Sequence, residues 1–378
     1  MSFATQSIHG DDECNRVPDV APPINVSTTY RFDNDNLVTA AELDPSIGVD
    51  EQLVYARESH PNAVRLEHVI SKLLGAPSVV YSSGLSAYFA ALIRFKPKKL
   101  FQAACYHSCV EAAEILSRIG GLKVYTLDDI DAECGPGDLI HIESPLNPYG
   151  ECVDVSHYAE RAHKVGAKLL LDATLAPPPL SNPWDLGADI VMHSGTKYFG
   201  GHSDLLCGII AVKDVETARL MRNERLVLGT IPASLESFLM LRSLRTMELR
   251  VRRQAENCTA LVKYLNDHKA EFGSVLKHIH HGSLQQEEFV KKQMTGGFGP
   301  LFSIILNSPD QCVKLVKNVK LFQHATSLGG VESLIEWRAM SDSHIDKKLV
   351  RLSVGVEHID DLIDDLVSVL KRLESGDL

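Results

Sequence analysis

The feature that most constrains the fold is an alternation of short apolar runs and helical patterns between residues 78 and 212. The apolar runs contain little polar alternation, which indicates strands that are covered on both faces. Strands that alternate with helices form βαβ units, so the pattern predicts an α/β fold with a mainly parallel sheet. We expect the strands at residues 78–81, 100–104, 122–127, 139–142, 168–171, 190–192 and 208–212, with helices between them, among them one from Leu85 and one near 110–119.

The segments on either side differ in character, and a length of 378 residues favours two domains. The first fifty residues contain several prolines and little periodicity, which indicates an irregular arm that packs against something, often a partner subunit. Helical spacing then predicts a helix that ends at Gly75. We assign residues 1–60 to the arm, 61–230 to a large domain and 231–378 to a smaller α+β domain.

The C-terminal domain shows its own pattern of elements. We expect a long helix at 234–253, strands at 301–306 and 352–356, and a last helix from His358. Aspartates lie early in this last helix and basic residues late, as the helix dipole favours.

Lys197 follows the buried run that ends at Met192, and two hydroxyl residues, Ser194 and Thr196, precede it. Ligands of open α/β sheets collect at the carboxyl ends of strands. Hydroxyls beside a lysine suit a phosphate held next to a reactive amine, which is the pairing that pyridoxal 5'-phosphate (PLP) enzymes need. The alternative is a surface lysine in a Ser/Thr-rich loop.

Four further residues follow successive predicted strands and so share one rim with Lys197: Gly84, Tyr106, Asn147 and Asp172. Asp172 can hold a protonated pyridine nitrogen, or it can cap the following segment. Backbone N–H groups of Ser83, Gly84 and Leu85 can bind phosphate, although an ordinary capped helix start has the same pattern.

Each remaining candidate also has a simpler reading. Tyr106 can stack on a planar ring or be a half-buried tyrosine, and Asn147 can donate to a ring hydroxyl or belong to a proline-bounded turn. Tyr55 and Arg57 lie in the arm, where the arginine suits a phosphate or is simply solvated.

Composition narrows the function classes. A net charge of −11 argues against nucleic acid or an anionic membrane as partner, and no run is long and apolar enough to span a bilayer. The N-terminus carries no visible secretory signal. The eight cysteines are scattered, which favours free thiols in a reducing compartment, and no second ligand pair accompanies Cys105 and Cys109. We therefore expect a cytoplasmic protein without a metal site.

The chain closely resembles the Cys/Met-metabolism family of PLP enzymes, which includes cystathionine γ-synthase, the cystathionine lyases, methionine γ-lyase and O-acetylhomoserine sulfhydrylase. The resemblance covers nearly the whole length. It rests on Pro22-Pro-Ile24, Tyr55-Ala-Arg57, Ser82-Ser-Gly-Leu85, Glu143-Ser-Pro-Leu-Asn-Pro148, Asp172, Ser194-Gly-Thr-Lys-Tyr198, Ser327-Leu-Gly-Gly330, Glu332-Ser-Leu334 and Arg351-Leu-Ser-Val-Gly-Val-Glu357.

The resemblance implies an aspartate-aminotransferase-like architecture (fold type I), with a seven-stranded sheet in the large domain. Lys197 would carry the cofactor as a Schiff base, with Asp172 on the pyridine nitrogen. Tyr106 would stack on the ring and help in proton transfer. The phosphate would be held by Ser83, Gly84, Leu85, Ser194 and Thr196.

It also implies a shared site and a substrate clamp. Tyr55 and Arg57 would reach the phosphate of the neighbouring subunit, in an assembly that is usually a homotetramer. Arg351 would bind the substrate carboxylate, with Asn147 and Ser327 nearby. Glu336 would lie near the distal amino group of the substrate, and the alternative for it is a solvated glutamate beside Arg338.

Three departures from the family pattern put the substrate in question. Ala173-Thr174 stands where Asn-Thr is usual, His107-Ser108 where Gly-Gly is frequent, and Ile231-Pro-Ala-Ser234 where many members have Ser-Pro-x-Asp.

We expect a trans-sulfuration enzyme of methionine and cysteine biosynthesis that makes or breaks the C–S bond of cystathionine or a relative. The alternatives are a sulfhydrylase or methionine γ-lyase, and a PLP-binding homologue with a structural or regulatory role.

Overall fold

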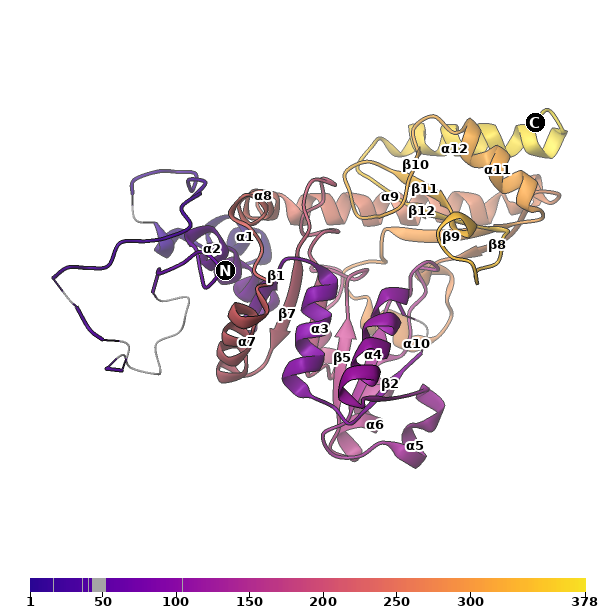
Figure 1. Cartoon of the computed structure of the whole chain (residues 1–378). Helices are drawn as coiled ribbons and strands as arrows, with labels where there is room; N and C mark the ends of the chain where they lie inside the picture. Colours follow the sequence, from indigo (N-terminus) through magenta and orange to yellow (C-terminus); the bar gives the residue numbers. More distant parts are fainter. Residues whose placement is uncertain (16, 36, 40, 43–51, 104) are drawn as a thin grey trace.

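A computed structural model describes residues 1–15, 17–35, 37–39, 41–42, 52–103 and 105–378. Two sheets organise this part of the chain, a seven-stranded one followed by a five-stranded one (Figure 1). None of its helices is both long and apolar enough to cross a membrane.

The seven-stranded sheet confirms the predicted strands, with shifts of a few residues at their ends. It contains β1 (Ser78–Tyr81), β2 (Lys99–Gln102), β3 (Lys123–Tyr125), β4 (Leu139–Glu143), β5 (Lys168–Asp172), β6 (Ile190–Ser194) and β7 (Gly208–Val212). Their order is β1-β7-β6-β5-β4-β2-β3, and β7 alone runs antiparallel to its neighbours. The predicted strand at 100–104 ends at Gln102, and Ala104 lies outside the described residues.

Helices cover both faces of this sheet, as the continuous apolar runs predict. The helices are α2 (Pro61–Leu74), α3 (Gly84–Phe95), α4 (His107–Gly120), α5 (Ile130–Glu133), α6 (Val155–Lys164) and α7 (Val215–Leu228). Along β5, Leu169 and Leu171 pack in one core with α2 and α6, whereas Leu170 packs in another with α3, α4 and α7. Gly75 has a φ of 66° and ends α2, as predicted.

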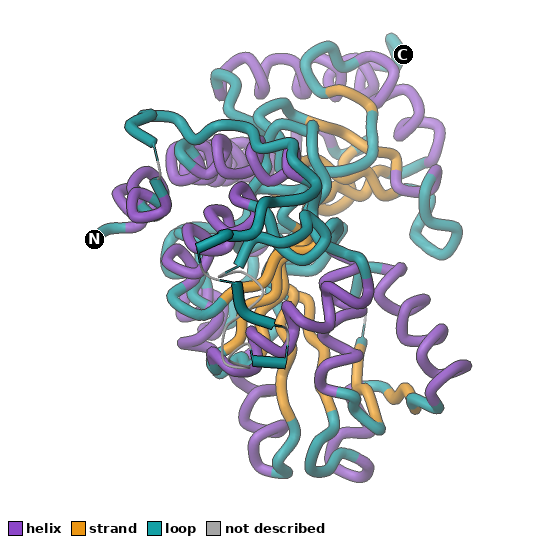
Figure 2. The backbone as a smooth tube through the Cα atoms, turned by 60° about the vertical axis from the view of Figure 1, so that its left-hand side comes forward, coloured by secondary structure: helices purple, strands orange, loops and turns teal. Residues whose placement is uncertain are grey.

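The second sheet is built from β8 (Leu276–His280), β9 (Leu301–Leu306), β10 (Gln323–His324), β11 (Leu334–Trp337) and β12 (Leu349–Ser353) in the order β10-β11-β12-β9-β8. The remaining helices are α8 (Ser234–Leu244), α9 (Met247–Asp267), α10 (Glu288–Gln293), α11 (Pro309–Asn318) and α12 (Ile359–Ser375). A separate core joins this sheet to α9, α11 and α12, and Figure 2 shows the strands of both sheets flanked by helices. The expected α+β character is confirmed.

The prediction of one helix at 234–253 is wrong, because the chain breaks between α8 and α9 at Arg245 and Thr246. The guanidinium of Arg250 donates to the Ser243 carbonyl at the end of α8 and also to the carbonyls of Tyr198 and Phe199. The Arg250 side chain thus satisfies the last turn of α8, and its distant contacts with Tyr198 and Phe199 cannot be read from the local sequence pattern. The strand expected at 352–356 lies three residues earlier, at Leu349–Ser353.

The expectation that the first fifty residues are irregular is also wrong in part, because α1 (Phe3–His9) is helical. Asp11, which is buried, anchors this start of the chain through ion pairs with Arg65 at 3.2 Å and Arg245 at 2.6 Å. Beyond these contacts the described parts of the arm extend away from the sheet (Figure 1).

Candidate active site

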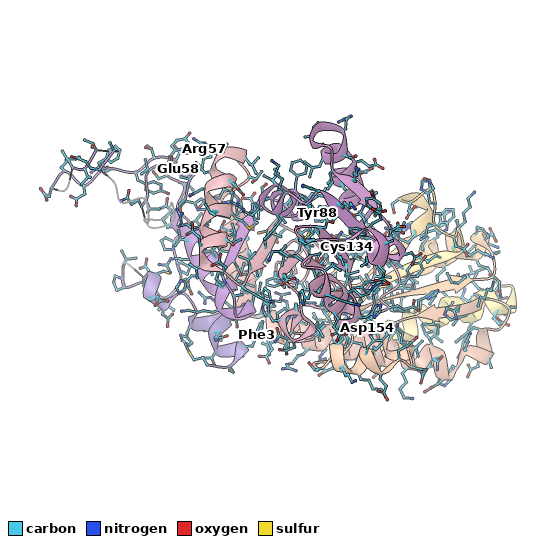
Figure 3. All side chains as sticks on the ribbon, turned by 90° about the horizontal axis from the view of Figure 1, so that it is seen from below. Phe3, Arg57, Glu58, Tyr88, Cys134 and Asp154 are labelled. Carbon is cyan, nitrogen blue, oxygen red and sulfur yellow. The ribbon has the colours of Figure 1, made fainter. Side chains whose placement is uncertain are left out.

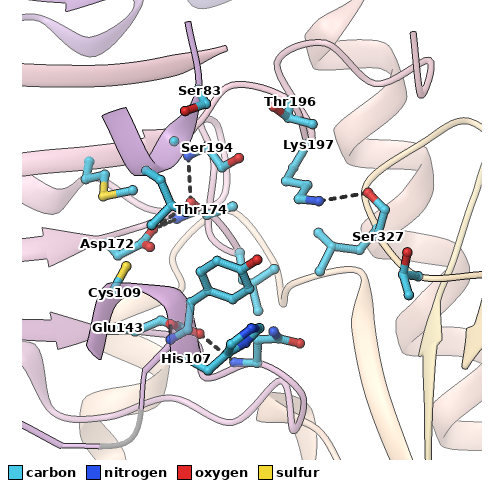
Figure 4. A pocket seen from close by; sticks show the side chains of 18 of the residues that line it. Ser83, His107, Cys109, Glu143, Asp172, Thr174, Ser194, Thr196, Lys197 and Ser327 are labelled. Carbon is cyan, nitrogen blue, oxygen red and sulfur yellow. Dashed lines mark hydrogen bonds between the residues drawn. The ribbon is translucent and has the colours of Figure 1, made fainter. Parts of the chain in front are cut away.

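The predicted rim residues converge on a cavity of about 470 Å³ between the two sheets. Its walls include Ser83, Gly84, Leu85, Tyr106, Asn147, Asp172, Ser194, Thr196, Lys197, Ser327 and Arg351 (Figure 4). The parallel strands β4 and β5 bring their carboxyl ends to the same edge, and β6 runs in the same direction beside them. The positions expected from sequence therefore come together in three dimensions.

Lys197 lies after β6, and its Nζ donates a hydrogen bond of 2.7 Å to Ser327 Oγ. Burial, with the nearby positive charge of Arg351, lowers the pKa of the Lys197 amine to about 8. About half of this amine is therefore neutral at a mildly basic pH near 8, and the neutral amine is the form that attacks a carbonyl carbon.

Asp172 and Glu143 form a buried pair of carboxylates on the facing ends of β5 and β4. Asp172 accepts hydrogen bonds from the backbone N–H and hydroxyl of Thr174, at 3.0 and 2.6 Å. Glu143 accepts from the backbone N–H groups of Tyr106 and Asn147, at 2.6 and 2.8 Å. Within the described chain neither carboxylate has an ion pair with a basic side chain, so this end of the cavity has a surplus of negative charge.

The pKa values of both carboxyl groups are raised, because burial disfavours their negative charges. Burial, together with the Asp172 charge, raises the pKa of Glu143 to about 8. Burial also raises the pKa of Asp172, and the hydrogen bonds from Thr174 oppose that rise. A cation placed against Asp172 would satisfy both groups, and a protonated pyridine nitrogen is such a cation.

The start of α3 provides the anion-binding side of the cavity. The Ser83 hydroxyl accepts a hydrogen bond from the backbone N–H of Ser86 and so caps the helix. The first N–H groups of a helix have no intrahelical partner, and they can bind an anion. A Cβ on Gly84 would lie 3.2 Å from Ser194 Oγ, so glycine lets that hydroxyl approach the helix end. The Thr196 hydroxyl is held by the backbone of Cys207.

These features fit PLP in its three parts: a lysine of lowered pKa, a carboxylate pair without a cation, and a helix N-terminus beside two hydroxyls. The side chain of Tyr106, 42% exposed, lies at the cavity between them and packs edge-on against His107 with ring centroids 4.7 Å apart.

Arg351 lies on β12 at the opposite wall and is almost completely buried. Its Nη1 donates to Asn147 Oδ1 at 2.9 Å, and its Nη2 donates to the Ser327 carbonyl at 2.7 Å. Glu336 on β11 is 3% exposed, so the alternative of a solvated glutamate is wrong. It does not line the cavity and instead forms ion pairs with Arg351 at 2.5 Å and Arg338 at 3.1 Å.

Like Glu336, the predicted residues Tyr55 and Arg57 do not line the cavity of their own chain. Arg57 donates to the Leu226 carbonyl at 2.9 Å, and its guanidinium lies 5.6 Å from the centre of the Tyr55 ring. Figure 3 shows Arg57 at the end of the molecule that carries the arm.

Sequence reasoning assigned no role to several cavity residues, notably Glu143 and Thr174. Glu143 directly follows the strand predicted at 139–142, on the same rim, so its position was a usable signal. The Thr174 hydroxyl links two residues of the site. It donates a hydrogen bond to Asp172 and accepts one from the Ser194 backbone N–H at 2.8 Å. His107 and Cys109 also line the cavity, at the start of α4.

Comparison with known proteins agrees with this geometry. The family model described as Cys/Met metabolism PLP-dependent enzyme matches residues 4–371. The chain is 31% identical to cystathionine gamma-synthase of Escherichia coli (strain K12) over 99% of this chain and 98% of that protein. It is 31% identical to cystathionine gamma-lyase of Dictyostelium discoideum over 98% of each.

A solved structure shows the same arrangement of the chain. Cystathionine gamma synthase from Xanthomonas oryzae pv. oryzae, in complex with cystathionine, superposes with a TM-score of 0.87 at 28% identity, covering 100% of both chains.

Proposed function

The chain belongs to the Cys/Met-metabolism family of PLP-dependent enzymes, and we propose that it makes or cleaves the C–S bond of cystathionine or a close relative. The family match extends over almost the whole chain, and the three relatives above are named for cystathionine, two as synthases and one as a lyase. The single observation that carries the proposal is the cavity that places Lys197, Asp172 and Arg351 on its walls.

PLP, when bound, withdraws electrons from the α-carbon of the substrate. Asp172 would hold the pyridine nitrogen, and the first turn of α3 with Ser194 would hold the phosphate. Lys197 would carry the cofactor and then, as a free amine with a pKa of about 8, would take and return the proton at the α-carbon. Tyr106, which lines the cavity, would stack on the ring and share in that proton transfer.

Arg351 supports recognition of an α-amino acid. Its planar guanidinium presents two N–H groups side by side, a geometry that matches a carboxylate. Asn147 and Ser327 already accept hydrogen bonds from it and so fix its direction.

We also propose a cytoplasmic homotetramer, built from dimers in which the arm of residues 1–60 completes the neighbouring site. The eight cysteines are all free thiols in the structure, which suits a reducing compartment. Support for the shared site comes from Tyr55 and Arg57, which lie outside the cavity of their own chain.

A substrate panel tests the proposal. The holoenzyme is incubated with cystathionine, homocysteine, cysteine or methionine alone, and with an O-acylhomoserine together with cysteine or sulfide. Keto acids and sulfur-containing products are measured against a Lys197→Ala control. We expect turnover of cystathionine, or its synthesis from an O-acylhomoserine and cysteine. Preference for methionine, or for an O-acylhomoserine with sulfide, would move the assignment to a methionine γ-lyase or a sulfhydrylase. A PLP-loaded protein that turns over none of them would be a non-catalytic homologue.

A further inference from the structure

We propose that Glu151, His278 and His280 form a binding site for Zn²⁺ or a similar divalent transition metal, outside the cofactor cavity. Each side chain offers one ligand atom, and these atoms all lie within 4.8 Å of one another. Two imidazoles and one carboxylate are a ligand set that Zn²⁺ takes readily, with a fourth position left for water.

The fold itself gathers these three side chains. His278 and His280 are two residues apart on β8, so both project from the same face of the strand. β8 is one of the two edge strands of the five-stranded sheet, and its pairing with β9 shifts register between Leu276 and His278. Glu151 comes from the segment after β4, 129 residues before His280.

A plain histidine–carboxylate pair explains only part of this arrangement. His280 Nδ1 lies 2.8 Å from Glu151 Oε1, and that contact needs no third residue. His278 nevertheless places its ring against His280, with centroids 4.4 Å apart at 70°. Zn²⁺ bonds of about 2.0–2.2 Å require ligand atoms roughly 3.3–3.6 Å apart. A bound ion would therefore replace the 2.8 Å contact between His280 and Glu151, and the exposed ring of His278 would turn towards them.

A metal ion at this site would link β8 to the segment that contains Asn147 and Glu151, and Asn147 lines the cofactor cavity. The Leu146 backbone N–H donates to the Glu151 carbonyl, and Asn147, which contacts Arg351, lies in the same segment. The Ser303 hydroxyl of β9 donates to the Pro148 carbonyl at 2.6 Å, and the Gly282 N–H donates to the Gly150 carbonyl at 3.0 Å. A bound ion would add a bond between this segment and β8.

Calorimetric titration of the holoenzyme with ZnCl2, after dialysis against a chelator, tests the inference. We expect one saturable ion per chain, and we expect His278→Ala and Glu151→Gln each to weaken binding more than about 100-fold, the upper end for loss of an outer-shell partner. His157→Ala, which removes an exposed histidine of α6, is the control and should bind as the wild type does.

Thermal unfolding and Co²⁺ absorbance complete the test, because they do not depend on activity. Zn²⁺ should raise the Tm of the wild type and the control but not of the two variants. A Co²⁺ spectrum without a strong thiolate band would place the ion on nitrogen and oxygen. Undiminished binding in His278→Ala, a thiolate spectrum, or no saturable binding would each overturn the site.

Discussion

Arg351 Nη2 lies 2.5 Å from Glu336 Oε2, and both side chains are buried. Arg338 holds the same carboxylate from the other side at 3.1 Å. The acidic residue therefore stands behind the arginine that we assign to the substrate carboxylate. It balances the charge of Arg351 and directs its guanidinium towards the cavity.

Replacement of Arg351 by alanine should raise the KM of every amino acid substrate by about 100-fold, because a charge-assisted pair contributes a few kcal/mol. Arg351→Lys should recover little, since lysine lacks the planar fork. Arg253→Ala, an exposed arginine of α9, is the matched control for steady-state kinetics. An unchanged KM for all substrates would refute the role of Arg351.

Glu336→Gln separates two roles for the carboxylate. As a positioning residue behind Arg351, Glu336 should affect cystathionine and short substrates such as cysteine equally, with kcat/KM lower by roughly 10-fold for each. Contact with the distal amino group would instead lower the turnover of cystathionine selectively. Parallel kcat/KM measurements on the two substrates distinguish these outcomes.

The carboxylate pair predicts how the stability of the PLP-free protein depends on pH. The folded protein holds a proton on Glu143 up to a pKa of about 8, whereas the unfolded chain releases it near the usual value of 4.5. Between these values the folded state binds more protons, so the free energy of unfolding falls as pH rises, by an amount on the order of a few kcal/mol.

Glu143→Gln should flatten this decline, because an amide does not titrate, whereas Glu114→Gln on the exposed side of α4 should leave it unchanged. The measurement is the Tm of the PLP-free protein between pH 5 and 8. Identical pH profiles for wild type and Glu143→Gln would show that Glu143 does not carry the shift.

Arg57→Ala should weaken PLP retention by roughly 10- to 100-fold if its guanidinium reaches the phosphate of a neighbouring subunit. Arg31→Ala, an exposed arginine of the same arm, is the control in equilibrium dialysis. An active monomer would rule out the shared site.

Subunit mixing gives an independent answer. At a PLP concentration that saturates only intact sites, Arg57→Ala and Lys197→Ala should each be inactive. Dissociated and reassembled together, they should regain activity, because one site per hybrid dimer then has both residues. Lack of recovery would place Arg57 in the site of its own chain or outside any site.

The parts of the fold that were predictable are those set by local patterns. Continuous apolar runs located the strands of the large sheet, and their order along the chain placed Gly84, Tyr106, Asn147 and Asp172 on one rim. The parts that were missed depend on contacts distant in sequence. The seven-residue helix α1 has no side-chain cap and is held by Arg245, and Arg250, just after the break that follows α8, is held by the carbonyls of Tyr198 and Phe199. Glu336 likewise meets Arg351 only through the pairing of β11 with β12, and His280 meets Glu151 only where β8 contacts the segment after β4.

Reduction with borohydride followed by peptide mapping tests most directly the claim that Lys197 holds the cofactor. Treated holoenzyme should carry one covalently bound pyridoxyl group per chain, on the peptide that contains Lys197, and Lys197→Ala should carry none. Labelling of a different lysine in the wild type, or the same labelling in Lys197→Ala, would contradict the account of the site.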